Sequence, residues 1–563
     1  MIKRLKSLKP WQIVLPIIVA LLVAQFILQV DLAKKDSQTI DEAVHIGAGY
    51  TYLTKGDYRF NAEHPPLVKE IAAFPLLFLN LDPNQDPTDW NNAGHYYLDP
   101  YGYSGNWGHN LLYYSNVAVD TILFYARIGP MLLTTLLGAV IALVAILAFG
   151  WWAGLIATVL YVLDPAFTGH GHLATTDIGA TLGYIAGIAS LWYLIKKPSY
   201  KSAAIFGVAL GIANLLKFTM LALGPISIML LGGYIIYNIE AKKDKAKRWW
   251  LLFVSFIVAT VVIWAGYGFH RTTLPMDTGY DAYGQVIAEP FNGALRQLYD
   301  FDNIAKWVPL PTDYLKGAAM VLNHTGGGHP SFLFGESKDS GWWYYFPVII
   351  TIKTPIISLF LMIFSLAVVI KQRKKNQFAV FLIASSLIYL TISMLSHANL
   401  GIRHILPFYP SLFIVVGYVF TLLSKKLKIV FSVLLAVLAI QFALMYPFYL
   451  SYFNQFVGGS YNGYKYATDS NLDWAQDLHR IKTYTDTHNL GVPYVFYNWD
   501  GDDAIDMYGI PRRPNANLAT DRSGYMIIGA STLQSPEMRW LFSYQLVDKI
   551  TPGVLVFNLD KLK

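Results

Sequence analysis

Two neighbouring acids, Asp41 and Glu42, follow the first long apolar segment of the sequence, and a Glu-His-Pro-Pro-Leu stretch occupies positions 63–67. Carboxylates next to a bilayer are costly to bury and are candidate functional groups by default. A carboxylate that reaches a hydroxyl group can accept its proton. We therefore take Asp41 and Glu42 as candidate catalytic residues of an enzyme that acts at a membrane surface on a lipid-bound substrate.

The same residues also fit the start of a helix. Glu42 and the threonine three residues before it have the spacing of a capping box, and acids stabilise a helix N-terminus. On such a helix Asp41 and His45 share one face. The two interpretations are compatible, because Glu42 can cap the helix while Asp41 acts. His64 precedes two prolines, the second of which suits the first position of another helix. We take His45, Glu63 and His64 as candidate substrate-binding residues.

Three cations, Lys217, Lys353 and Arg403, lie in or beside apolar segments, and His404 follows Arg403. A cation at this depth is costly unless its long side chain reaches the membrane surface or meets an anion. A guanidinium group suits two-point contact with a phosphate. We therefore take these four residues as candidate ligands of a lipid phosphate. For Lys217 the alternative is that its side chain only extends to the membrane surface.

Two further acids are candidate substrate-binding residues. Asp177 stands at the outer mouth of the fourth apolar segment, where it is either a site residue or an interfacial cap. Its spacing to His170 and His172 is not diagnostic of a metal site, so we identify no cofactor and expect no divalent metal. Glu336 precedes an aromatic run at 342–346, which suits an interfacial belt as well as stacking on sugars or prenyl chains.

The composition is that of a polytopic membrane protein. Of 563 residues, 54% are hydrophobic and 14% charged, whereas soluble proteins carry roughly 25% charged residues. The net charge is +7, but the basic residues form short clusters between apolar segments, which indicates topology rather than a nucleic-acid partner. There is no cysteine, which excludes disulfides and thiolate metal sites.

Apolar segments of about 20 residues can cross a bilayer as helices, and the sequence contains about eleven. They lie at 11–30, 127–149, 151–164, 174–195, 202–216, 219–238, 249–268, 347–370, 377–395, 402–423 and 429–448. Basic clusters at 196–201, 242–248, 371–375 and 425–428 then all fall on one side, together with the N-terminus. The positive-inside rule makes that side cytoplasmic. We expect a multi-pass protein of the cell membrane.

This topology places three long segments outside the cytoplasm. We predict a transmembrane catalytic domain at 1–448, with extracytoplasmic loops at 31–126 and 269–346, and an extracytoplasmic α/β domain at 449–563. Helices are expected near 40–54 and 67–80 in the first loop. In the last segment, the patterns predict a helix near 473–488 that carries Trp474 and strands near 494–497, 525–528 and 554–557.

The motifs resemble those of the protein O-mannosyltransferase family (glycosyltransferase family 39), which is related to the bacterial aminoarabinose transferases of lipid A. The first block reads Asp-Glu-x-x-His at 41–45, Gly-Asp at 56–57 and Glu-His-Pro-Pro-Leu-x-Lys at 63–69. Later blocks follow in order at 174–177, 211–219, 342–347, 353–355 and 399–410, and the stretch 452–474 is similar to the tail of bacterial members.

The resemblance implies a GT-C membrane fold and an inverting glycosyltransferase that takes a mannose-like sugar from a polyprenyl phosphate. By resemblance, Asp41 is the base, and Arg403 and Lys353 hold the donor phosphate. The chain lacks the β-trefoil domain of eukaryotic members in the 269–346 loop and carries an α/β domain at its end. The acceptor is expected to be a protein Ser/Thr hydroxyl, with a lipid or glycan as the alternative.

Two other functions fit part of the pattern. A transporter of lipid-linked sugars would place its polar site near the bilayer midplane, often between repeats. The polar residues here gather towards one face, and the sequence has no internal repeat, which disfavours transport. A non-catalytic protein that binds polyprenyl phosphates through its cations would not need Asp41. We expect membrane lipids, the lipid-linked sugar and the acceptor as partners.

Overall fold

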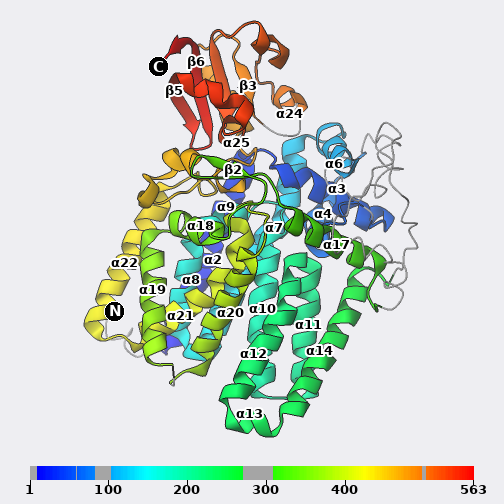
Figure 1. Ribbon diagram of the computed structural model, residues 1–563, viewed down its shortest axis with the longest axis vertical. Coiled ribbons are helices and arrows are strands. Elements are labelled where there is room, and N and C mark those ends of the chain that lie inside the picture. Colours follow the sequence, from blue (N-terminus) through cyan, green and yellow to red (C-terminus); the bar gives the residue numbers. More distant parts are fainter. Residues whose placement is uncertain (1–8, 59, 83–102, 270–307, 374, 498–501) are drawn as a thin grey trace.

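The computed structural model describes residues 9–563 except residues 59, 83–102, 270–307, 374 and 498–501. Most of the Asp- and Tyr-rich part of the first loop and about half of the second loop therefore lie outside the described residues. Helices run side by side along the long axis of the molecule, and a small sheet covers one end (Figure 1).

Eight described helical segments are long and apolar enough to cross a membrane. They are α2 (Pro10–Lys35), α7 (Val119–Phe149), α10 (Asp177–Lys196), η2 (Phe218–Ala222) with α12 (Leu223–Tyr237), α14 (Lys245–Gly266), α20 (Gln377–Met394), η4 (Ile402–Phe408) with α21 (Tyr409–Leu422), and α22 (Lys425–Leu444). This arrangement confirms the expected polytopic helical class.

The other three expected spans are bent or short. The helix pair α18 (Tyr345–Lys353) and α19 (Ile356–Lys371) is bent by 118° at the break between the two helices. Thr354 adopts an extended conformation between them, because a residue before proline avoids helical geometry. Helix α11 (Tyr200–Leu216) and the 12-residue α8 (Trp151–Val162) are apolar but shorter. Twelve residues reach only about 18 Å, less than the ~30 Å hydrocarbon core, so the count of eleven crossings stays a prediction.

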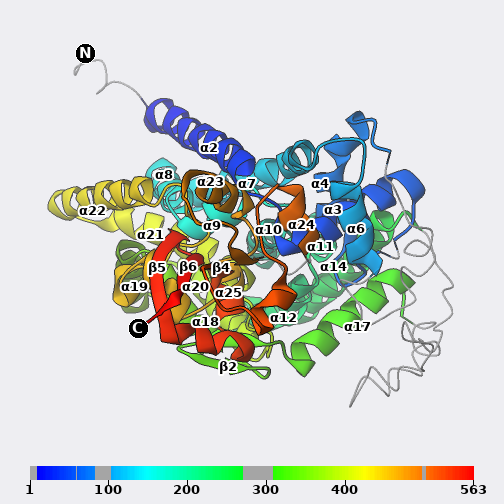
Figure 2. The ribbon, with the colours of Figure 1, turned by 90° about the horizontal axis from the view of Figure 1, so that it is seen from above.

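Small residues allow the helices to pack closely, as is common in membrane bundles. Gly207 and Gly211 on α11 face Val258 and Val262 of α14, and a Cβ added at either glycine would lie 2.6 Å from a valine Cβ. Helices α10, α11 and α14 consequently stand next to one another in both ribbon views (Figures 1 and 2).

Short helices of the first loop form one end of the bundle. Helices α3 (Ile40–Lys55) and α4 (Pro66–Ala73), the latter continued by η1 (Phe74–Phe78), correspond to the two predicted helices. Helix α4 starts at the proline predicted for its first position. Helix α6 (Tyr103–Tyr113) packs against α3, where Gly108 comes so close that a Cβ would collide with the Ala43 carbonyl. Helix α9 (Pro165–His170) lies at this end too.

The second loop contributes α17 (Thr312–Gly327) and an antiparallel hairpin of β1 (Ser331–Leu333) and β2 (Glu336–Lys338). At the opposite end of the molecule, the short helix α13 (Ile239–Lys243) connects α12 to α14 (Figure 1).

The segment after α22 folds into short helices around a four-stranded sheet of order β3-β4-β6-β5. Its strands are β3 (Tyr494–Phe496), β4 (Tyr525–Gly529), β5 (Tyr544–Thr551) and β6 (Val554–Leu562), and β3–β4 is the one parallel pair. Its helices are η5 (Gln455–Val457), η6 (Ser460–Lys465), η7 (Asp469–Asn471), α23 (Leu478–Thr487), α24 (Asp502–Met507), η8 (Asn515–Ala519), α25 (Ala530–Leu533) and η9 (Pro536–Ser543).

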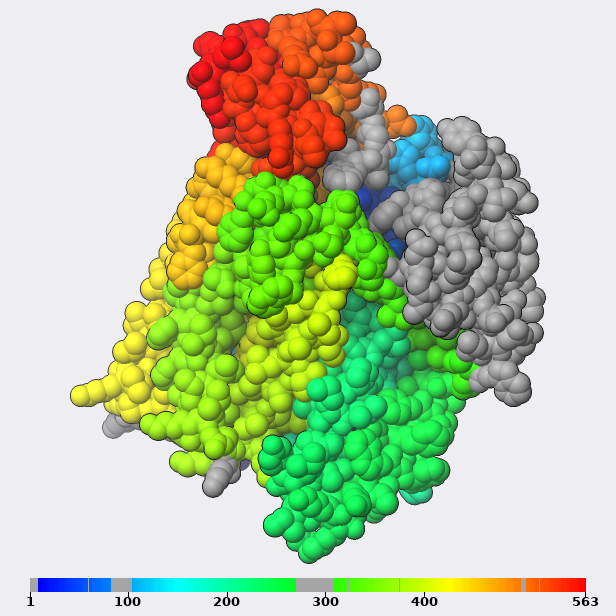
Figure 3. All heavy atoms as spheres, viewed as in Figure 1, coloured from blue at the N-terminus to red at the C-terminus, as the bar shows by residue number. Residues whose placement is uncertain are grey.

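The three expected strands are present in this C-terminal unit, and β5 was not anticipated. The expected helix near 473–488 begins only at Leu478, so Trp474 lies outside it. The unit sits on the end of the bundle that carries α3 and α6 (Figure 3).

Candidate functional site

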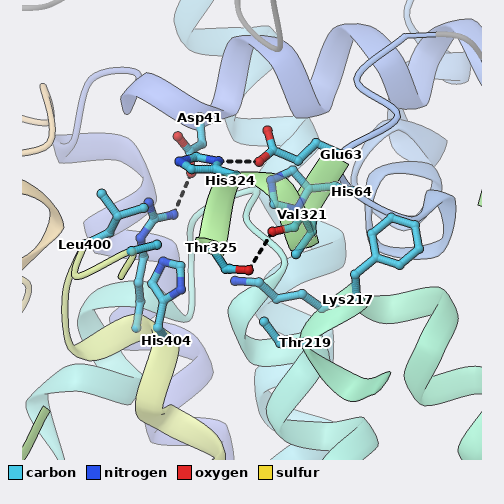
Figure 4. Close-up of a pocket in the computed structure, with 13 residues that line it drawn as sticks. Asp41, Glu63, His64, Lys217, Thr219, Val321, His324, Thr325, Leu400 and His404 are labelled. Carbon is cyan, nitrogen blue, oxygen red and sulfur yellow. Dashed lines mark hydrogen bonds and ion pairs between the residues drawn. The ribbon is translucent and has the colours of Figure 1, made fainter. Parts of the chain in front are cut away.

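A pocket lies where the first loop, α17 and the start of η4 meet, and 13 residues line it (Figure 4). It holds about 600 Å³ of empty space, including its open mouth. Asp41, Glu63 and His324 point toward one another on one side, and Lys217 and His404 lie on the other (Figure 4). Six of the residues predicted from sequence therefore line one cavity: Asp41, Glu63, His64, Lys217, Arg403 and His404.

Asp41 and Arg403 form a buried ion pair in this pocket. Arg403 Nη1 donates to Asp41 Oδ2 at 2.5 Å, and both side chains are less than one-tenth exposed. Asp41 lies in the first turn of α3, and Arg403 belongs to η4. The preceding Gly401 has φ +145°, a conformation that favours glycine, and this turn brings the Arg403 backbone to the pocket.

Glu63 and His324 form a second pair. Glu63 Oε1 lies 2.5 Å from His324 Nδ1, and this hydrogen bond, opposed by burial, raises the pKa of His324 above its usual value. His64 lies next to Glu63, and burial lowers the pKa of its ring well below the usual value, so it is neutral. His45 packs edge-on against His64 and donates its Nδ1–H to the Ala174 carbonyl, which places it behind the pocket wall.

Lys217 is bound to Asp177 on the far side of the pocket. Lys217 Nζ lies 2.6 Å from Asp177 Oδ1, and Arg403 Nη1 lies 3.9 Å from Asp177 Oδ2. Helix α11 ends where Lys217 adopts an extended conformation, and η2 begins immediately after it. Asp177 thus holds two cations in position without lining the cavity itself.

Besides His45 and Asp177, three more predicted site residues lie away from the cavity lining. Glu42 is fully buried and forms an ion pair of 2.6 Å with Arg127 on α7, besides accepting a hydrogen bond from the Thr39 N–H. Lys353 Nζ donates to the carbonyls of Leu450 and Asn471.

Glu336 is the third of these residues. It is solvent-exposed on β2 and pairs with Lys338 at 3.5 Å.

Other residues at the pocket were not anticipated. His324 and Thr325 line it from α17, and nothing in their sequence spacing marks them. Arg127 was predicted at the start of the apolar segment 127–149. A charged residue beside an apolar segment is costly unless it is paired, so its position indicated an ion-pair partner. Trp474 was assigned to a helix face, yet its ring lies 4.1 Å from the Arg403 guanidinium carbon.

Comparison with known proteins agrees with this architecture. Residues 18–274 match the family model described as dolichyl-phosphate-mannose-protein mannosyltransferase. No curated protein sequence matches the chain significantly. The crystal structure of ArnT from Cupriavidus metallidurans bound to undecaprenyl phosphate has a TM-score of 0.50 at 12% identity, over 96% of this chain and 97% of that chain.

A second solved structure is the archaeal oligosaccharyltransferase AglB from Archaeoglobus fulgidus, in complex with an inhibitory peptide and a dolichol-phosphate. Its TM-score is 0.43 at 11% identity, over 94% of this chain and 72% of that chain. The family match and the whole-chain likeness to ArnT confirm the resemblance expected from the motifs. The chain is therefore a multi-pass membrane glycosyltransferase with the GT-C fold, and its residues 18–274 match the dolichyl-phosphate-mannose-protein mannosyltransferase family model.

Proposed function

We propose that this enzyme transfers a mannose-like sugar from a polyprenyl phosphate to a Ser/Thr hydroxyl of an extracytoplasmic protein, with inversion at the anomeric carbon. The observation that carries the proposal is the meeting of Asp41, Arg403 and Lys217 at one cavity. The family match supports the sugar and the protein acceptor. The undecaprenyl phosphate in ArnT, which shares the fold, supports the lipid carrier.

In this proposal Asp41 is the base. The acceptor oxygen forms a bond with the anomeric carbon and loses its proton to a carboxylate oxygen of Asp41. The bond between the anomeric carbon and the phosphate oxygen breaks, and its electron pair leaves with the polyprenyl phosphate. Glu63 and His64, which line the same wall, contact the sugar or the acceptor.

The departing phosphate is held by cations. Arg403 offers a planar fork of donors, and Lys217 and His404 line the same cavity. Arg403 is bound to Asp41 in the structure. An incoming phosphate competes with Asp41 for the guanidinium group. When the phosphate displaces the Asp41 carboxylate, that carboxylate is free to accept a proton. Lys353 supports this region from outside the cavity through its two backbone contacts.

We also propose the arrangement in the membrane. Residues 1–448 form the transmembrane catalytic domain and 449–563 an extracytoplasmic domain, in the cell membrane, with the N-terminus in the cytoplasm. The pocket then opens at the extracytoplasmic face, where the acceptor is found.

Sugar transfer by the purified protein tests the proposal. In lipid nanodiscs with a radiolabelled polyprenyl-phosphate sugar and an envelope fraction, wild type is expected to label protein, and Asp41→Asn to lose at least about a hundredfold in rate, the usual scale for a general base. Asp41→Asn should still bind the donor. Asp31→Asn is the matched control, because Asp31 is an exposed acid that pairs with Lys35 at the end of α2.

The products decide between acceptors. Label in protein that is released by β-elimination supports a Ser/Thr hydroxyl, whereas label in the lipid or glycan fraction replaces the protein acceptor with one of these. Full activity of a folded Asp41→Asn variant would remove Asp41 as the base.

A further inference from the structure

The segment that follows the last apolar helix forms part of the surroundings of Arg403. Arg403 Nε donates to Ser470 Oγ at 3.0 Å, and the Arg403 guanidinium carbon lies 4.1 Å from the centroid of the Trp474 ring. Ser470 and Trp474 are buried. A cation over the face of a tryptophan is attracted to the ring, and more strongly when water is excluded.

These contacts hold Arg403 in one orientation. Ser470 Oγ donates to the Leu400 carbonyl at 2.6 Å, so its lone pair is directed toward Arg403 Nε. Asp41 occupies Nη1 and Ser470 occupies Nε, and neither contact uses Nη2. When a phosphate displaces Asp41, the contacts with Ser470 and Trp474 remain. The guanidinium is then already oriented, which lowers the entropic cost of binding.

The C-terminal sheet holds this segment in place through Ser531, which follows strand β4 in α25. Ser531 donates its hydroxyl to Asp473 Oδ1 at 2.5 Å and its backbone N–H to Asp473 Oδ2 at 3.1 Å. Ser531 Oγ also accepts a hydrogen bond from the Asp469 N–H at 2.9 Å. Gly529 allows the approach, because a Cβ there would lie 2.7 Å from Asp473 Oδ2.

The backbone around Arg403 is fixed by the same segment. Asn471 Oδ1 accepts a hydrogen bond from the Ile402 N–H at 3.0 Å, and its Nδ2 donates to the Tyr345 hydroxyl at 2.9 Å. Both the side chain and the backbone of the Arg403 turn therefore depend on residues 470–474. These residues are in turn tied to the sheet by Ser531.

We propose that Ser470 and Trp474 are positioning residues for Arg403 and that the C-terminal unit thereby completes the binding site for the donor phosphate. This inference rests on the proposed function, in which Arg403 holds that phosphate. It gives the C-terminal α/β unit a part in substrate binding that is exerted through Arg403. Loss of either contact leaves Arg403 in place but less ordered. The affinity for the donor should therefore fall while the protein still folds.

Binding of undecaprenyl phosphate to the purified full-length protein in nanodiscs tests this role. Trp474→Leu is expected to raise the Kd roughly three- to thirtyfold, the range of a cation–π contact. Ser470→Ala is expected to raise it about tenfold, because a hydrogen bond to a charged group is lost. Trp474→Phe, which keeps an aromatic face, should restore most of the affinity.

The control is a second cation–π pair in the same unit. Trp540 lies against Arg522, 4.5 Å from ring centroid to guanidinium carbon, and neither residue lines the pocket. Trp540→Leu should leave the Kd for undecaprenyl phosphate unchanged. A similar loss of affinity in Trp540→Leu and Trp474→Leu would mean that both act through general stability, and this would overturn the proposal.

A double-mutant cycle separates positioning from a purely structural role. In an Arg403→Lys background the planar fork is absent, so Trp474→Leu and Ser470→Ala should change the Kd less than about twofold. Equal effects in both backgrounds would refute coupling through Arg403. If Trp474→Leu does not fold, Ser470→Ala, which removes a single oxygen, decides alone.

Binding to the wild-type protein distinguishes failure of the proposed function from failure of the positioning role. If wild type does not bind undecaprenyl phosphate, the proposed function fails. If wild type binds it and every variant binds it equally well, the proposed function stands and the positioning role is wrong.

Discussion

Each acid of the site is paired with a basic residue from another part of the chain. Asp41 binds Arg403, Glu63 binds His324, and Asp177 binds Lys217. Buried charges are tolerated when they are paired in this way. In the proposed reaction, the phosphate therefore competes with Asp41 for Arg403, because this cation already has a carboxylate partner.

The Glu63–His324 pair predicts a pH dependence of stability. The hydrogen bond to Glu63 raises the pKa of His324, so the folded protein holds this proton at a pH where the unfolded chain has lost it. The pair's contribution is complete below the usual histidine pKa of about 6.5 and is lost as pH rises through the folded value. The melting temperature of wild type should fall over this range, and His324→Gln should remove that part of the fall.

Thermal unfolding in detergent between pH 6 and 9 measures the effect. His397→Gln is the control, because the His397 ring contacts the Gly326 carbonyl rather than a carboxylate. An unchanged pH slope in His324→Gln would show that the pair does not contribute.

At the residue level, the sequence indicated the chemical types but not their pairing. Asp41, Arg403 and Lys217 were recognised because charged residues beside apolar segments are rare and costly. Whether such a residue faces the cavity depends on contacts across hundreds of positions. Asp41 and Glu42 are adjacent in sequence, yet one lines the pocket and the other is bound to Arg127.

At the level of elements, the Glu42–Arg127 pair joins α3 to α7. Arg127 donates to both oxygens of Glu42, at 2.8 and 2.6 Å, and to the carbonyls of Ala33, Asp36 and Ser37. It thereby links the end of α2, the start of α3 and α7. Because Asp41 immediately precedes Glu42 in α3, the Glu42–Arg127 pair also fixes the position of Asp41.

Removing one partner of this pair should destabilise the protein strongly. Glu42→Ala leaves Arg127 buried without its carboxylate, which costs about 3–5 kcal/mol. Heating in detergent followed by size-exclusion chromatography should show a clear loss of folded protein. Asp31→Ala, at an exposed pair, should stay within about 0.5 kcal/mol of wild type. A Glu42→Ala variant as stable as wild type but inactive would favour the catalytic role for Glu42 instead.

Most elements followed from sequence because their patterns are local. The apolar helices, α3, α4 and strands β3, β4 and β6 occur where length, capping residues and apolar runs predicted them. Strand β5 was missed because apolar and polar residues do not alternate along this edge of the sheet: Leu546 and Val547 are neighbours, as are Asp548 and Lys549. The start of α23 was misjudged, because Trp474 is held by tertiary contacts with Arg403 rather than by helical periodicity.

At the scale of the whole molecule, α3 and the sheet lie toward one end, and α13 lies at the other (Figure 1). The pocket is lined by Asp41 of α3 and therefore belongs to the end that carries the sheet. The positive-inside rule predicts that α13 faces the cytoplasm. The chain contains no cysteine, so single cysteines can be placed as unique labels. Glu537→Cys lies in the C-terminal unit and Lys243→Cys in α13, and both positions are exposed.

A membrane-impermeant maleimide should label Glu537→Cys on intact cells and Lys243→Cys only after permeabilisation. Cysteine-free wild type provides the background. Labelling of Lys243→Cys on intact cells would invert the proposed topology and move the pocket to the cytoplasmic side.

The order in which the chain leaves the ribosome gives the Asp41–Arg403 pair a final consequence. The two residues are 362 positions apart, and Ser470 and Trp474 emerge later still. Asp41 is therefore synthesised long before Arg403. In the proposed mechanism the site is therefore complete only after Arg403, Ser470 and Trp474 have been synthesised, and a product that stops before Arg403 lacks the guanidinium that pairs with Asp41.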